Sequence, residues 1–168
     1  MGVDMILLTG NPGNGVSNGA ITDTLRRLKA SVGDKVILAA GKMHASGIPS
    51  EAGEHIITAR DVEEFIGAGA DIVLFPAPGT VPGITMEYVR SLVKGTPTAA
   101  GVLTMTSIGT SQEGADTETI RQIALMCKMS GTDIQSSGRF RLHWHGTAGN
   151  ICYSKRSVEP DMHTAWMA

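Results

Sequence analysis

Five short apolar segments recur along the chain with helical periodicity between them, and this repeat constrains the fold most strongly. The segments begin at residues 4, 35, 71, 98 and 133, so successive starts lie 31, 36, 27 and 35 residues apart. The segments do not alternate between apolar and polar residues, which is typical of strands buried on both faces of a parallel sheet. The repeat predicts an α/β protein with about four to five parallel βα units. The expected strands are 4–10, 35–42, 71–77, 98–107 and 133–138.

Apolar stripes define the helices expected between these strands. Their members fall three, four or seven residues apart, which places them on one face of a helix. Polar residues before three of the stripes are predicted to cap the helices, namely Asn18, Thr85 and Asp116. The stripes are Ile21, Leu25 and Leu28; Val62, Phe65 and Ile66; Val89, Leu92 and Val93; and Ile120, Ile123, Ala124 and Cys127.

Two architectures contain such a repeat, an open doubly wound sheet and a (β/α)₈ (TIM) barrel. A complete barrel needs about 250 residues, whereas the chain has 168. A barrel formed by this chain would therefore be partial. The pattern stops after Ser136, and we expect a partial barrel over 1–135 and an atypical, irregular C-terminal tail over 136–168. A frame disruption would explain that change.

Charge and composition exclude several classes of partner. The formal net charge is −2 and no run of lysine or arginine is present, which argues against nucleic acid as a partner. The chain contains no apolar run of membrane-spanning length, so no membrane partner is expected. Two cysteines, Cys127 and Cys152, are too few for a disulfide framework, and no signal-type segment opens the chain. These features predict a cytoplasmic protein.

Glycine is frequent, with 21 residues in 168, and much of it lies in the segments that follow the first four strands. The carboxyl ends of parallel strands share one edge of a sheet, which is where α/β proteins bind ligands. Short βα loops need some glycine in any case, but four such loops at one edge favour a small-molecule site. The predicted ligand-binding residues are Asn11, Gly13, Gly15, Ser17, Gly79, Thr80, Gly83, Thr110, Ser111 and Gln112.

The first of these loops resembles three known motifs without matching any. Gly10 and Gly15 have P-loop spacing, but Val16 replaces the lysine that would reach a phosphate. A third glycine of the dinucleotide motif is missing at Asn18. Ser17 lies too far past the strand to be an elbow nucleophile, and we interpret it as part of a helix cap. Backbone N–H groups and a helix N-terminus here can still hold an anion.

The predicted catalytic residues are Lys42, His44 and Glu113. Lys42 ends the second strand, where a lysine can act as a base or bind an anion, and His44 can exchange protons near neutral pH. The alternative for Lys42 is a surface lysine at a strand end, and Glu113 could equally be a helix cap. No spacing of Cys, His, Asp or Glu indicates a metal site, and the sequence identifies no cofactor.

Segments 7–18, 40–44, 69–85 and 108–135 are similar to a bacterial TIM-barrel family of uncharacterised function. Its members are variously labelled haloacid dehalogenase-like hydrolase or phosphoenolpyruvate phosphonomutase-like. The resemblance implies that this chain is the C-terminal half of a barrel and lacks an N-terminal half. Dehalogenase chemistry needs an Asp-x-Asp nucleophile motif, which the chain does not contain. The metal-binding carboxylates of a phosphonomutase are also missing from this portion.

Together these observations predict a TIM-barrel enzyme fragment, of hydrolase, lyase or isomerase type, that acts on a small anionic metabolite, phosphorylated or carboxylated. Two alternatives stay open: a non-catalytic metabolite-binding module and an inactive truncated gene product. A half-barrel leaves strand edges unpaired. We therefore expect either a homo-oligomer or completion by the missing N-terminal half.

Overall fold

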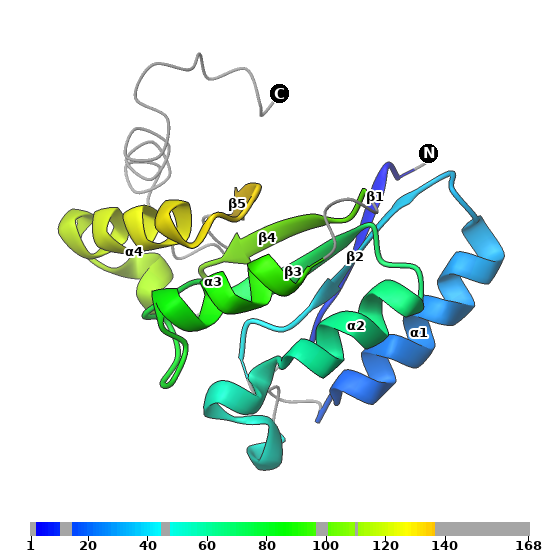
Figure 1. Ribbon diagram of the computed structural model, residues 1–168, viewed down its shortest axis with the longest axis horizontal. Coiled ribbons are helices and arrows are strands. Elements are labelled where there is room, and N and C mark those ends of the chain that lie inside the picture. The colour runs from blue at the N-terminus through cyan, green and yellow to red at the C-terminus, as the bar shows by residue number, and fades with distance from the viewer. Residues whose placement is uncertain (1–2, 11–14, 45–47, 97–100, 110, 137–168) are drawn as a thin grey trace.

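The computed structural model describes residues 3–10, 15–44, 48–96, 101–109 and 111–136. Strands and α-helices alternate along these residues (Figure 1), as the βα repeat predicts. Three short 3₁₀ turns, η1, η2 and η4, lie in the loops that follow β2 and β4. In chain order the elements are β1 (Met5–Leu8), α1 (Asn18–Val32), β2 (Ile37–Gly41), η1 (Pro49–Glu51), η2 (Gly53–Ile56), α2 (Ala59–Gly67), β3 (Ile72–Pro76), α3 (Met86–Gly95), β4 (Leu103–Ser107), η4 (Ser111–Gly114), α4 (Thr117–Ser130) and β5 (Ile134–Ser136).

The five strands form one parallel sheet in the order β1-β2-β3-β4-β5. A doubly wound sheet reverses its strand order at a switch point, whereas a barrel adds each strand beside the previous one. The sequential order, together with helices on one side of a curved sheet (Figure 1), defines a partial (β/α)₈ barrel. The predicted fold class is confirmed and the doubly wound alternative is wrong.

The main core lies between the sheet and the helices. Side chains of alternate strand residues, such as Leu38, Val73 and Phe75, pack there against Leu25 and Phe65 of the helices, all of them fully buried. The next residues along the same strands face the opposite side of the sheet. That second side carries a smaller cluster formed by Ala39, Met43, Ile72, Leu74 and Met105.

Exposed apolar residues lie on the same side of the sheet as this smaller cluster, nearer the amino ends of the strands. Met5 is paired in register with Ile37, and Ile72 with Leu103. Met5, Ile37 and Leu103 are 44–47% exposed, and Leu7 of β1 is 38% exposed. In a closed barrel these positions fill the interior. The concave side of this half-barrel is therefore an apolar surface.

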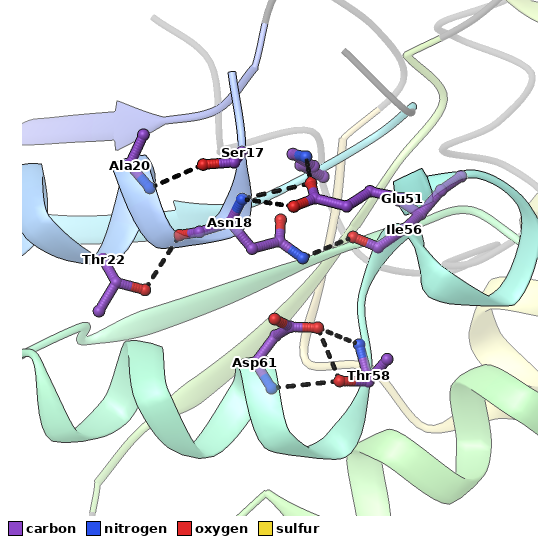
Figure 2. Close-up of polar contacts among 9 residues, drawn as sticks. Ser17, Asn18, Ala20, Thr22, Glu51, Ile56, Thr58 and Asp61 are labelled. Carbon is purple, nitrogen blue, oxygen red and sulfur yellow. Dashed lines mark hydrogen bonds and ion pairs between the residues drawn. The ribbon is translucent and has the colours of Figure 1, made fainter. Parts of the chain in front are cut away.

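Each α-helix begins at a capping side chain. Thr85 and Asp116 cap α3 and α4 as predicted. Ser17, rather than Asn18, caps α1: its extended backbone lets the hydroxyl accept from the Ala20 N–H, while Asn18 is already helical. Thr58 caps α2 through a reciprocal capping box with Asp61 (Figure 2).

The predicted strands begin before the observed ones in every case, and for β1, β2 and β3 they also end later. The largest difference is in β4, which begins at Leu103 rather than at residue 98. Residues 97–100 and the tail from 137 onward lie outside the described residues. Within the described part of the chain, no helix combines the length and the apolar character required to cross a bilayer.

Candidate functional site

The candidate site lies where β2 ends at the carboxyl edge of the sheet. Lys42 directly follows β2, and its side chain is completely buried. The alternative interpretation of Lys42 as a surface lysine is therefore wrong. Lysine is among the residues least often buried, and a buried ammonium needs a partner of opposite charge.

Glu51 is that partner. It ends the 3₁₀ turn η1, nine residues after Lys42, and its carboxylate forms an ion pair with the Lys42 ammonium through Oε2. The Glu51 side chain is 22% exposed, so the pair is buried on the lysine side and reaches solvent on the glutamate side. Removing one member of such a pair leaves the other charge without compensation.

The Glu51 carboxylate also contacts the start of α1. Both of its oxygens lie 3.3 Å from the backbone nitrogen of Asn18, the first residue of that helix (Figure 2). The first N–H groups of a helix have no partner within the helix, and the helix dipole favours a negative charge there. One carboxylate is thus held by a buried cation and by a helix N-terminus.

The Asn18 side chain also lies beside the Lys42–Glu51 pair and is buried. It is 6% exposed, and its Nδ2 donates to the Ile56 carbonyl at 3.1 Å (Figure 2). Among the described residues its Oδ1 atom has no hydrogen-bond partner. Buried polar atoms are nearly always satisfied, so an acceptor of this kind is often explained by a ligand, an ion or a water.

The segment that carries Glu51 is fixed to the core at its C-terminal end, next to α2. Ile56 and Ile57 are fully buried, and the Tyr88 hydroxyl of α3 lies 2.9 Å from both the Glu54 and the Ile57 carbonyl oxygens, which share its one donated hydrogen. Burial is the main cause that raises the pKa of Tyr88. The end of the segment nearest α2 is therefore fixed to the core.

Other polar groups lie at the same edge. His44, two residues after Lys42, is partly buried. Thr9 follows β1, and within the described chain its buried Oγ1 atom also has no hydrogen-bond partner. The strands β1 and β2 are neighbours, so both residues belong to the edge that holds Lys42.

The predicted ligand-binding residues are divided between two places. Gly15, with a positive φ of 60°, and the cap residue Ser17 lie at the start of α1, beside the Lys42–Glu51 pair. Gly79 and Gly83 instead line an open groove of about 530 Å³ together with Met126 and Met129. The Thr80 hydroxyl donates to the Ala77 carbonyl at 2.6 Å. The groove is mostly apolar, unlike an anion site.

The remaining predicted residues are described partly or not at all. Asn11, Gly13 and Thr110 lie outside the described residues. Ser111 and Glu113 are described only as backbone of η4, and Gln112 beside them is partly buried. In the described ranges, no group of three or more His, Cys, Asp or Glu side chains is arranged to hold a metal ion.

Glu51 is the residue that the sequence interpretation missed. Its only signal is that it is one of two glutamates, with Glu54, in a loop with Pro and Gly after the predicted strand of Lys42, and many loops contain such residues. The pairing depends on how η1 folds back over α1, which sequence spacing does not reveal.

The fold and this edge define a partial TIM barrel with a buried lysine at the end of its second strand. The chain belongs to the family described as a domain of unknown function, DUF7916, whose model matches residues 1–166. The match includes residues 136–166 of the C-terminal stretch. No curated protein matches the chain.

A solved structure supports the same architecture. The crystal structure of a putative deoxyribose-phosphate aldolase from Coccidioides immitis is similar, with a TM-score of 0.62 at 11% sequence identity. The similarity covers 94% of this chain and 56% of that one, so the chain spans just over half the length of that neighbour. At this identity the likeness shows a TIM-barrel fold.

Proposed function

We propose that this chain provides the ligand-binding edge of a TIM-barrel enzyme that acts on a small anionic metabolite, phosphorylated or carboxylated. The observation that carries the proposal is the complete burial of Lys42 at the end of β2, where TIM-barrel enzymes hold their reacting groups. A buried ammonium facing one carboxylate marks a position where the protein stabilises negative charge.

Each polar residue has a proposed role. Lys42 binds the anionic group of the substrate, because its ammonium is a compact cation in a water-poor setting. His44 exchanges a proton near neutral pH, and Glu113 in the loop after β4 is the proposed second acid or base. Such acid–base chemistry suits a lyase or an isomerase.

The experiment is a substrate screen with the whole chain. Small 2-oxo acids and phosphate esters are incubated in deuterated water, and ¹H and ³¹P NMR follow proton exchange and product formation. We expect turnover of at least one compound, and at least a hundredfold loss in Lys42→Met. A folded Lys42→Met protein with unchanged turnover would contradict the proposal.

Lys29 is the matched control for this substitution. It also forms ion pairs, with Asp34 at 2.9 Å and with Asp71 at 3.4 Å, but Asp71 precedes β3 and therefore lies at the opposite edge of the sheet. Lys29→Met should retain turnover. Ligand binding without turnover of any compound would support the non-catalytic binding module in place of an enzyme.

A further inference from the structure

We propose that the corner formed by Lys42 and Asn18 binds a small anion that carries a hydroxyl donor, such as a 2-hydroxy acid or hydrogen phosphate, and that the Glu51 carboxylate competes with this ligand for the same place. The inference rests on the proposed function, because it uses the same lysine as the ligand-binding cation. It adds the chemical class of the ligand and a competing group within the chain.

The anion-binding part of the corner consists of two donors that converge on one carboxylate. One is the completely buried Lys42 ammonium, and the other is the Asn18 backbone N–H at the start of α1. Both Glu51 oxygens lie 3.3 Å from the Asn18 nitrogen, whereas hydrogen bonds to ionised groups are usually about 2.7–2.9 Å long. Glu51 therefore satisfies the helix N-terminus only loosely.

The Asn18 side chain specifies the hydroxyl. Its Nδ2 donates to the Ile56 carbonyl, which fixes the amide so that Oδ1 lies on the side facing Glu51 (Figure 2). Oδ1 is a buried acceptor without a partner among the described residues, and an ionised carboxylate cannot donate to it. A ligand with a hydroxyl next to its anionic group would satisfy both Oδ1 and the Lys42 ammonium.

Glu51 is able to leave this place without disturbing the core. The turn η1 that carries it has no buried residues, while the anchors of the segment, Ile56 and Ile57, are fully buried further along. The Glu51 side chain also reaches solvent, which gives a ligand a route of exchange. Movement of η1 alone would free the corner.

Two pairs of probes test the ligand class. Glycolate and acetate differ by one hydroxyl, and hydrogen phosphate and sulfate differ in the same way. Dissociation constants are measured by calorimetry with the full chain and with Glu51→Ala. We expect Glu51→Ala to bind glycolate at least tenfold more tightly than the unaltered chain does, and glycolate to bind at least fivefold more tightly than acetate.

Control variants separate this site from general anion effects. Glu54 is an exposed carboxylate in the adjacent turn η2, so Glu54→Ala should bind glycolate as the unaltered chain does. The double variant Lys42→Met/Glu51→Ala should lose the binding. Equal affinity of Glu51→Ala and the unaltered chain would overturn the competition, and equal affinity for glycolate and acetate would overturn the hydroxyl donor.

Two further outcomes keep the proposal testable. If Glu51→Ala is unfolded, glycolate should restore its folding more effectively than acetate at equal concentration, and equal restoration would overturn the proposal.

Glycolate binding that depends on Lys42, in a chain without turnover of any compound, supports this inference while contradicting the proposed enzyme function. Turnover that depends on Lys42 but is unaffected by Glu51→Ala supports the proposed enzyme function and contradicts the competition by Glu51.

Discussion

The carboxylate of Glu51 forms an ion pair with Lys42, nine residues before it, and accepts the first backbone N–H of α1 at Asn18. This contact joins the end of β2 to the start of the preceding helix. It follows that the stability and the ligand preference of the corner depend on the same two charges.

Breaking the pair from one side should be costly. Glu51→Ala leaves the Lys42 ammonium buried without a counter-charge, a change that typically costs about 3–5 kcal/mol. Urea unfolding monitored by circular dichroism measures the difference. Replacing both groups with apolar residues, in Lys42→Met/Glu51→Leu, should recover most of the loss, and a double variant as unstable as Glu51→Ala would argue against a charge effect.

Gly41 should tolerate no side chain. It pairs with Leu74 in the sheet, and a Cβ atom at position 41 would collide with the Leu74 carbonyl oxygen. We expect Gly41→Ala to lower the free energy of unfolding by about 1–3 kcal/mol, as overpacking does. Gly67 is the matched control because a Cβ there meets open space at the end of α2. Gly67→Ala should be neutral or slightly stabilising, and equal effects at the two sites would contradict the packing argument.

Cys127 should be inert in the folded protein. Its side chain faces the cluster around Ile120 and Ile123, and burial raises the pKa of the thiol to about 11. The thiolate is the reactive form, so alkylation by iodoacetamide at pH 8 should require unfolding. The rate is measured in a Cys152→Ser background, which leaves Cys127 as the one thiol. Labelling as fast as that of a free thiol would contradict the burial.

Asp116 should contribute a pH-dependent term to stability. Its carboxylate accepts from the Thr119 hydroxyl and from the Thr119 and Glu118 N–H groups, and these bonds hold its pKa below the usual range. A lowered folded-state pKa stabilises the fold above the unfolded-state pKa, and this contribution is lost as the pH falls through the lowered value. Thermal unfolding of the unaltered chain and of Asp116→Ala should differ most at neutral pH, and the difference should shrink as the pH falls below the ordinary aspartate pKa of about 3.9. A constant difference would contradict the assignment.

The apolar concave side should drive association of the chain. Met5 and Leu7 of the edge strand β1 are exposed together with Ile37 of β2. We expect sedimentation velocity to show more than one copy per particle, and Leu7→Lys to shift the distribution toward the monomer. A stable, well-folded monomer at micromolar concentration would contradict this prediction.

The sequence predicted the parallel sheet because the apolar segments and the helical stripes repeat locally, and each element needs only its own residues to be recognised. Ser17 and Asn18 show where this reasoning loses precision, since both residue types are good caps and the backbone angles decide between them. Lys42 could be placed at a strand end, but its burial depends on Glu51, which reaches it through a turn of the chain. Such a contact between a strand end and a loop carries no periodic signal.

The most direct test of the site is a titration of the ¹⁵N-labelled chain with glycolate, followed through the backbone amide resonance of Asn18. We expect a saturable shift of that resonance, greater with glycolate than with acetate and lost in Lys42→Met. An Asn18 resonance that does not move, while residues elsewhere in the chain respond to the same additions, would contradict an anion site at Lys42 and Asn18.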